Sequence, residues 1–204
     1  MIGTVLPIVY GDRERGRLGI AHWLHAVGSV SGGVAVGAAF GSLGVAVALL
    51  IDVSAATMLL IVGAVAAAYS LRELGLFDVP MPQVHRQVPA SWRRRYPANV
   101  VAFLYGVGLG AGVGTFVRVA TLYVIIVWII LAASPAEGAI LMGAFGAARG
   151  LPIVWLGHEL TSVEQGFAVS RLLDNWEVVT HFINGVLLSW AAAYFVVLSL
   201  RGVT

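Results

Sequence analysis

The sequence predicts an all-α integral membrane protein with five full transmembrane helices and a short N-terminal half-helix. Of its 204 residues, 59% are hydrophobic and only 11% are charged, and the mean hydropathy is +0.92. Several stretches of roughly 20 residues carry few or no charges, the length that ~30 Å of hydrocarbon requires of a helix rising ~1.5 Å per residue. These runs are continuous, whereas the strands of a transmembrane barrel would alternate apolar and polar residues.

The apolar stretches set the order of the expected elements. The residues between the first two full spans, 42–51, are also apolar, so they either lengthen one span or form a short interfacial turn before Asp52, a candidate N-cap. In order, the sequence predicts a stub at about 1–10 and full spans at 18–41, 53–72, 98–132, 136–157 and 177–199.

The segment 98–132 is too long for a single straight crossing, because about 35 helical residues would reach ~52 Å. It is expected to tilt strongly or to break. Glycine lowers helix propensity and permits the backbone dihedrals that a break needs, although the same glycines could simply let helices pack closely. Glycines at alternate positions mark the expected place: Gly106, Gly108, Gly110, Gly112 and Gly114.

Arginine predicts the orientation, since all twelve basic residues are Arg and most lie in two short segments, 11–17 and 72–97. Both should be cytoplasmic, and the two spans between them agree with that. We expect a multi-pass protein of a prokaryotic cytoplasmic membrane with the lipid bilayer around it. The net charge of +2 is too small to suggest nucleic acid. Four tryptophans are expected as interfacial anchors near span ends: Trp92, Trp155, Trp176 and Trp190.

Two absences restrict the chemistry. There is no cysteine, which excludes disulfides, thiolate metal sites and thiol–disulfide exchange within this chain. No nucleophile elbow and no phosphate-binding glycine loop occur, so we do not expect an enzyme, and nothing indicates a bound cofactor.

A faint repeat relates the two halves. The tripeptides Gly3-Thr4-Val5 and Gly114-Thr115-Phe116 each precede a basic residue and a further pair of apolar spans. In this setting the chain resembles the CcdA/DsbD-type transmembrane family, the cytochrome c biogenesis transmembrane region of the LysE-like superfamily. The opening 3–10 is similar to the family's Pro-Cys-x-Leu-Pro…Tyr motif. Further similar stretches are His25 to Gly33, Ala102 to Gly110 and Gly150-Leu151-Pro152.

The resemblance implies one transmembrane domain of two three-helix repeats in inverted arrangement. Repeat 1 would cover about 1–75, a basic cytoplasmic loop 76–97, and repeat 2 98–204. Thr4 and Thr115 stand where the family has its electron-shuttling cysteines. A hydroxyl cannot form a mixed disulfide, so the chain resembles a divergent, cysteine-free member without the redox relay. A redox role would need cysteines on a partner chain.

The candidate substrate site is made of Thr4, Gly114, Thr115 and Arg118. Arg118 follows Thr115 by three residues, so a helix would place both on one face. A hydroxyl, freed backbone groups and a guanidinium could hold a small anion or carboxylate. Arg149 lies within the fifth span, where a structural ion pair or snorkelling to the interface is the alternative to a functional role.

His22 and His25 are weak metal-site candidates. Their spacing of three residues suits metal binding or proton relay, but two neutral histidines bonded to the backbone are the commoner outcome. No third ligand is evident nearby.

Two hypotheses follow. The leading hypothesis is a transporter that moves a small solute or ion through a mid-membrane site. The alternative is a non-catalytic membrane subunit or assembly factor of a larger complex, whose glycine-rich faces dock on another membrane protein chain or on further copies of itself. A stub of about ten residues would leave the N-terminal amine near mid-membrane unless the stub lies at the interface; otherwise water reaches the amine or, as we favour, a partner chain covers it.

Overall fold

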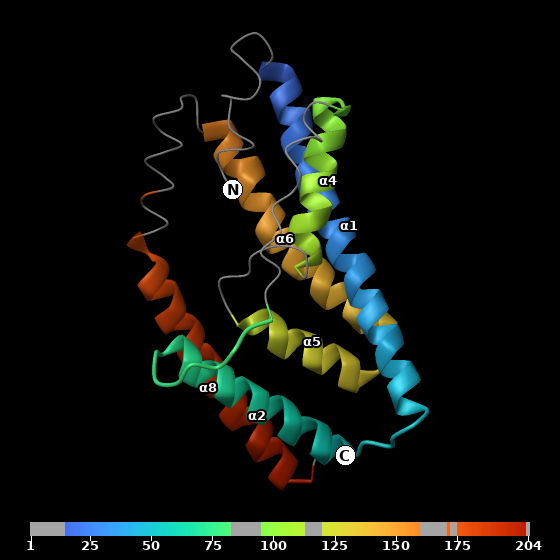
Figure 1. Cartoon of the computed structure of the whole chain (residues 1–204), viewed down its shortest axis with the longest axis vertical. Coiled ribbons are helices and arrows are strands. Elements are labelled where there is room, and N and C mark those ends of the chain that lie inside the picture. Colours follow the sequence, from blue (N-terminus) through green and yellow to red (C-terminus); the bar gives the residue numbers. More distant parts are fainter. Residues whose placement is uncertain (1–14, 83–94, 113–119, 160–170, 172–174, 203–204) are drawn as a thin grey trace. The chain divides into compact units, whose positions relative to one another are not determined.

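The computed structural model describes residues 15–82, 95–112, 120–159, 171 and 175–202. Over these ranges the regular structure is helical and contains no strand, which confirms the all-α fold class (Figure 1). The helices are α1 (Arg15–Ala48), α2 (Ala55–Glu73), α4 (Ala98–Ala111), α5 (Thr121–Ala132), α6 (Pro135–Glu159) and α8 (Glu177–Leu200).

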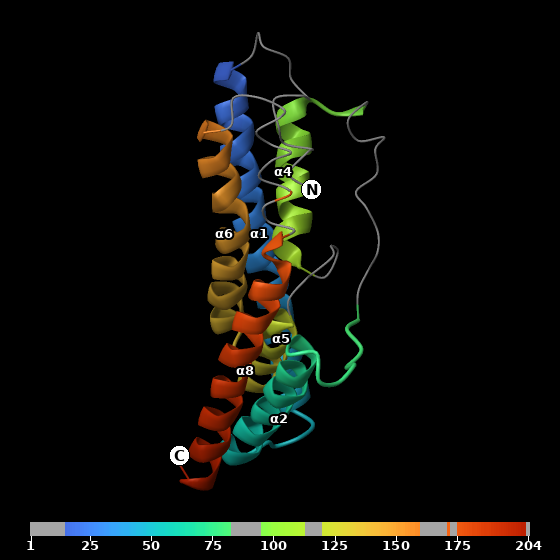
Figure 2. The same ribbon diagram turned by 90° about the vertical axis from the view of Figure 1, so that its left-hand side faces the viewer.

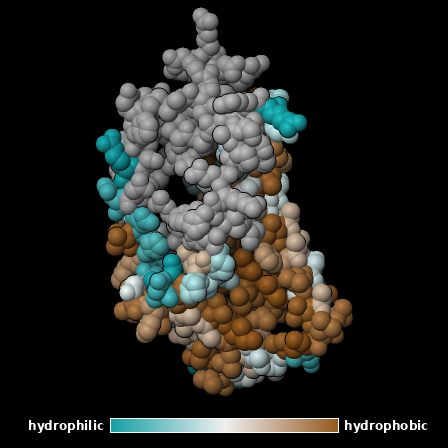
Figure 3. Space-filling model, viewed as in Figure 1, coloured by the Kyte–Doolittle hydropathy of each residue, from teal (hydrophilic) through white to brown (hydrophobic). Residues whose placement is uncertain are grey.

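Four of these helices are long and apolar enough to cross a membrane: Gly19–Ala48 of α1, α2, Pro135–Trp155 of α6, and α8. The other two, α4 and α5, are apolar but shorter, with 14 and 12 residues. Large hydrophobic side chains lie exposed on the long helices, and Figure 3 shows hydrophobic surface gathered over α5 on the face it displays. Such a surface suits contact with lipid.

The junction between α1 and α2 decides between the two alternatives for residues 42–51. Helix α1 continues to Ala48, so most of this stretch lengthens the first span. The N-cap of α2 is Ser54, and the prediction of Asp52 is wrong. Ser54 has the extended dihedrals that an N-cap needs, φ −61° and ψ 152°, and its hydroxyl accepts a hydrogen bond from the Thr57 amide at 3.2 Å.

The break in segment 98–132 is confirmed, since α4 ends at Ala111 and α5 begins at Thr121. Gly112 follows α4 with a φ of 70°, a conformation that costs a side-chain-bearing residue energy and glycine almost none. The expected tilt of one long helix is therefore not needed.

The chain divides into two compact units. Unit 1 comprises Met1–Val36, Val84–Phe116 and Ile140–Trp176, and unit 2 comprises Gly37–Gln83, Val117–Ala139 and Glu177–Thr204. Helices α1 and α6 contribute residues to both. The division into two sequence repeats stays a prediction.

In unit 1, helices α1, α4 and α6 pack through glycines (Figure 2). A Cβ on Gly28 or Gly32 of α1 would overlap carbonyl oxygens of α4. Reciprocally, a Cβ on Gly106 or Gly110 of α4 would overlap the carbonyls of α1. These glycines therefore permit close backbone approach, as the packing alternative predicted.

Ser29 lies where the three helices of unit 1 meet. It is fully buried, and its hydroxyl donates to the Gly146 carbonyl of α6 at 2.7 Å. Its own carbonyl oxygen lies against Gly110 and Gly146, where a Cβ would overlap it. The hydroxyl's hydrogen bond replaces the water it would have outside a membrane.

Unit 2 is built around α2 and α8, which pack along one another (Figure 1). Ser70 of α2 donates to the Gly185 carbonyl at 2.9 Å and lies 2.6 Å from the Ser189 hydroxyl. Helix α5 packs on the same pair. The buried core residues are Val62, Ala66, Ala120, Val124, Leu188 and Ala192.

Candidate functional site

The substrate site predicted from the sequence cannot be placed. Thr4, Gly114, Thr115 and Arg118 all lie outside the described residues. Their role stays a prediction.

His22 and His25 are both buried in unit 1. Nδ1 of His25 lies 3.2 Å from the Ala102 carbonyl of α4, so it carries the proton and Nε2 is an acceptor without a hydrogen-bond partner among the described residues. Within the described ranges, no group of three His, Cys, Asp or Glu side chains is placed to hold a metal ion. The contact of His25 fits the backbone-bonded alternative, and a metal-binding role for His22 and His25 stays a prediction.

Arg149 of α6 makes structural contacts in unit 1. Its guanidinium donates to the Leu109 carbonyl near the end of α4 at 2.9 Å and lies 5.4 Å from the centre of the Phe145 ring. A cation beside the carbonyls that end a helix interacts favourably with the helix dipole. These contacts fit the structural alternative for Arg149 in the sequence analysis.

A polar site in unit 2 is a junction of three elements, which we call the Glu73 junction: Glu73, Ala120 and His181. Glu73 ends α2, and its carboxylate is 1% exposed. One carboxylate oxygen lies 2.5 Å from Nδ1 of His181 on α8, and the other accepts the Ala120 amide at 2.6 Å. A buried carboxylate is stable in such a position because both of its oxygens are bonded.

The Glu73 carboxylate also caps a helix. Ala120 is the N-cap residue of α5, so the carboxylate satisfies an amide at the positive end of that helix. It thereby connects α2, α5 and α8.

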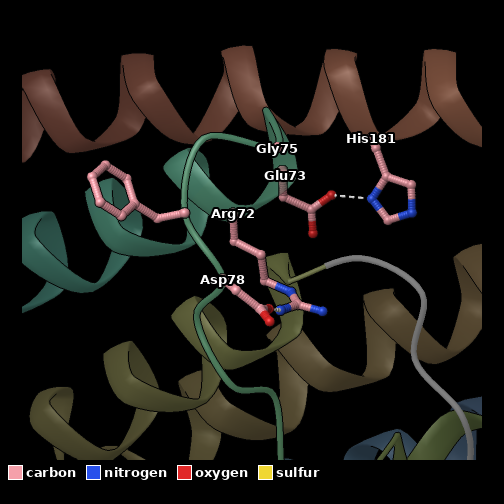
Figure 4. Close-up of a pocket in the computed structure, with 6 residues that line it drawn as sticks. Arg72, Glu73, Gly75, Asp78 and His181 are labelled. Carbon is pink, nitrogen blue, oxygen red and sulfur yellow. Dashed lines mark hydrogen bonds and ion pairs between the residues drawn. The ribbon is translucent and has the colours of Figure 1, made fainter.

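An open pocket of about 290 Å³ lies beside the Glu73 junction, at the C-terminal end of α2. Figure 4 shows the Glu73 carboxylate directed at His181, and the Arg72 and Asp78 side chains lying together nearby. Arg72 donates to Asp78 at 2.9 Å and to the Val79 carbonyl. The Asp78 side chain is 98% exposed, so this ion pair faces solvent. Six residues line the pocket: Arg72, Glu73, Gly75, Phe77, Asp78 and His181.

Further polar contacts continue between α2, α5 and α8. The Thr121 hydroxyl donates to the Asn184 carbonyl oxygen one turn of α8 beyond His181. The side-chain nitrogen of Asn184 is buried and has no hydrogen-bond partner among the described residues. Together with the Ser70–Ser189 contact, these groups form a polar seam inside helices that are otherwise apolar.

Chemically, the Glu73 junction is a fixed carboxylate–imidazole pair. Glu73 orients the His181 ring so that its other nitrogen, Nε2, points away from the carboxylate and lies 3.9 Å from Glu177. The pair holds three helices together and leaves His181 one-third exposed at the pocket. Sequence reasoning missed both residues. The sequence did contain a signal: both residues are ionisable and lie within or at the end of a predicted span, where an unpaired charge is costly, so each could have been expected to have a partner.

Comparison with known proteins gives a consistent result. The chain is 32% identical to the methylamine utilization protein MauF of Methylophilus methylotrophus over 80% of this chain and 55% of that protein. It is 31% identical to MauF of Paracoccus versutus over 68% of this chain and 52% of that protein. With MauF of Paracoccus denitrificans it shares 28% identity over 91% of this chain and 67% of that protein. The chain thus spans about half the length of the first two relatives. No family model matches the chain, and no solved structure matches it at a significant level.

These relatives correct two predictions. The resemblance to the CcdA/DsbD-type family is wrong, because the curated relatives that match are all MauF proteins and nothing points to that family. Short glycine-rich motifs such as Gly-Thr or Gly-Leu-Pro recur in apolar helices because small residues let helices pack closely, so these motifs are not specific to one family. The transporter hypothesis is wrong as well, since the relatives fit the accessory or assembly alternative better.

Proposed function

We propose that this chain is a membrane-embedded accessory or assembly component of methylamine utilization, which acts on a protein partner and catalyses no reaction itself. The observation that carries the proposal is the 32% identity to a methylamine utilization protein over 80% of this chain. The alternative hypothesis from the sequence, a non-catalytic subunit or assembly factor, predicted a role of this kind.

The membrane part of the proposal rests on the helices. Four of them are long and apolar enough to cross a bilayer. A fifth crossing within 98–132 is part of the proposal, and the apolar helices α4 and α5, of 14 and 12 residues, supply its hydrophobic length. In this topology the arginine-rich segments 11–17 and 72–97 face the cytoplasm of a bacterium.

A non-catalytic role is supported by the way the polar groups of unit 2 are used. Both oxygens of Glu73 are bonded within the chain, and Arg72 is bonded to Asp78 and Val79. Groups that are already paired in this way stabilise helix packing, whereas a catalytic base needs reach to a substrate proton. The exposed Asp78 and Phe77 at the pocket are suited to contact with a partner's polypeptide.

Complementation tests the proposal directly. In Paracoccus denitrificans, the matched 193 residues of its own MauF would be replaced by this chain, so that the rest of the longer protein is retained. Growth would be compared on methylamine and on succinate, with a MauF deletion strain as the reference. We expect the chimaera to restore whatever methylamine-specific growth the deletion loses. A chimaera that is present in the membrane yet restores none of that growth contradicts the proposal.

The partner is tested separately. Gentle detergent extraction of tagged chain from cells grown on methylamine should yield a stoichiometric complex containing a second protein needed for that growth. The purified chain alone should consume no methylamine. Consumption by the chain alone, with turnover lost in a site variant, would overturn the non-catalytic reading.

A further inference from the structure

Helix α8 carries an exposed stripe, which we call the outer stripe. Its members are 52%, 61%, 76%, 61% and 44% exposed, in chain order. Their spacing is four, three, four and three residues, the spacing of the seam in a left-handed pair of helices. The outer stripe consists of Ile183, Leu187, Trp190, Tyr194 and Val197.

The outer stripe lies opposite the face that α8 already uses. The buried residues of α8 face the packing of unit 2 and are Gly185, Leu188, Ala192 and Ser199. At ~100° per residue, the centres of the two sets lie about 170° apart around the helix. The outer stripe is therefore a second apolar seam on a helix whose first seam is filled.

The outer stripe differs from an ordinary lipid-facing surface in where its tryptophan and tyrosine lie along the helix. Helix α8 has 24 residues, and Trp190 lies thirteen residues after Glu177 and ten before Leu200. The sequence-based expectation that Trp190 anchors the helix at an interface is thus wrong, because this position is near the middle of the span. Tryptophan and tyrosine favour the interfaces, where their N–H and O–H groups reach water.

At this depth the polar atoms of the stripe need partners. Among the described residues, the Trp190 indole N–H and the Tyr194 hydroxyl have no hydrogen bond; the centre of the Tyr194 ring lies 5.9 Å from that of the Phe195 ring. Lipid tails offer no acceptor, so an unsatisfied N–H or O–H in hydrocarbon costs free energy. A polar partner at mid-membrane would remove that cost.

We propose that the outer stripe binds the same stripe of a second copy of this chain, as a parallel two-fold dimer of α8. The chain supplies both halves of the missing contact. Trp190 is only a donor and Tyr194 can accept, and they lie four residues apart on one face, so a two-fold axis pairs each indole N–H with the hydroxyl of the other copy. A different partner helix would have to bring its own acceptor near that depth, whereas a second copy brings a tyrosine hydroxyl about one helical turn along the axis, a distance that the two long side chains can span.

Cysteine cross-linking tests the proposal with little ambiguity, because the natural chain contains no cysteine. Ile183→Cys and Phe182→Cys form a matched pair. The two residues are adjacent in depth and are 52% and 60% exposed, but Phe182 lies about 100° around the helix from the centre of the outer stripe. Under mild oxidation in native membranes, we expect Ile183→Cys, and likewise Leu187→Cys, to form a product of twice the chain's mass, and Phe182→Cys to remain monomeric.

The hydrogen bonds are tested by removing them without removing the rings. Trp190→Phe with Tyr194→Phe should raise the dimer dissociation constant about tenfold in detergent, since two hydrogen bonds per dimer are lost. A third variant, Phe182→Ala, should leave it unchanged. Equal cross-linking at positions 182 and 183, no cross-linking at 183 and 187, or a product containing a different protein would each overturn the proposal. The proposed function does not depend on this dimer, so complementation can succeed where dimerisation fails.

Discussion

The carboxylate of Glu73 and the imidazole of His181 lie 2.5 Å apart, although 108 residues separate them in the chain. Because Glu73 also accepts the Ala120 amide, a single buried side chain holds the end of α2, the start of α5 and the first turns of α8. In a chain with 11% charged residues, such a carboxylate is a point on which the packing of unit 2 depends.

Replacement of Glu73 should destabilise unit 2. Glu73→Ala leaves the Ala120 amide and His181 without their shared acceptor in a buried place, and we expect the free energy of unfolding to fall by about 3 kcal/mol. Denaturant unfolding in detergent, followed by circular dichroism, measures this. Asp78→Ala is the control, because Asp78 is 98% exposed and its ion pair faces solvent. Equal effects of the two substitutions would contradict the assignment of Glu73 as a buried three-way contact.

The glycines of unit 1 should differ sharply in their tolerance of a side chain. In Gly110→Ala the new Cβ meets the Ser29 backbone, which cannot move as a flexible side chain can, so we expect a loss of about 2 kcal/mol in unfolding free energy. Gly108→Ala is the matched control on the same helix, since no described atom lies within 4 Å of its Cβ position. There the substitution should be neutral or stabilising, because alanine favours the helix. The ranking of the two unfolding midpoints checks the prediction.

The N-cap of α2 can be identified by substitution. Ser54→Ala removes the acceptor for the Thr57 amide, and we expect it to cost about 1 kcal/mol. Asp52→Ala should have a smaller effect, since Asp52 does not cap the helix. Unfolding midpoints of the two single variants measured in one detergent decide the matter, and a larger loss for Asp52→Ala would show that the cap is misplaced.

The sidedness of the membrane is accessible through the same cysteine-free background. Leu76→Cys lies in the arginine-rich segment and should react with a membrane-impermeant maleimide only after the membrane is opened. Gly202→Cys, after α8, should react in intact cells. Gly202 has a φ of 61°, a conformation that strains a cysteine, so Arg201→Cys serves as a second variant at that end. Labelling of Leu76→Cys in intact cells would contradict the predicted orientation and show that this segment lies outside the cytoplasm.

Much of the fold follows from composition and periodicity. The all-α class, the long apolar spans and the interruption within 98–132 were predictable because hydrocarbon demands helices of a minimum length and because 98–132 exceeds that length. The extension of α1 to Ala48 and the N-cap at Ser54 needed the structure. Residues 42–51 are apolar whether they continue a helix or turn at an interface, so hydropathy does not separate the two.

The site shows the limit more clearly. The sequence directed attention to Thr115 through a family resemblance that the relatives do not support and to Arg118 as a charge within a predicted span, and it passed over Glu73 and His181. Glu73 lies in the first half of the chain and His181 near its end, and neither belongs to a local motif. The contact between Glu73 and His181 depends on the relative direction of α2 and α8 and on their register, which only the packed structure fixes.

The sequence by itself determined that this protein is made of apolar helices long enough for a membrane, that it has no thiol chemistry of its own, and that a segment as long as 98–132 must tilt or break; Gly106, Gly108 and Gly110, marked as part of the break, are helical in α4. Tertiary structure decided which glycines bring backbones together, which carboxylate is buried and paired, and that Trp190 stands exposed near the middle of α8. The physical reason is range. Hydropathy and helix propensity act within about 20 residues, whereas the contacts of Ser29 with Gly146 and of Glu73 with His181 join residues more than 100 positions apart.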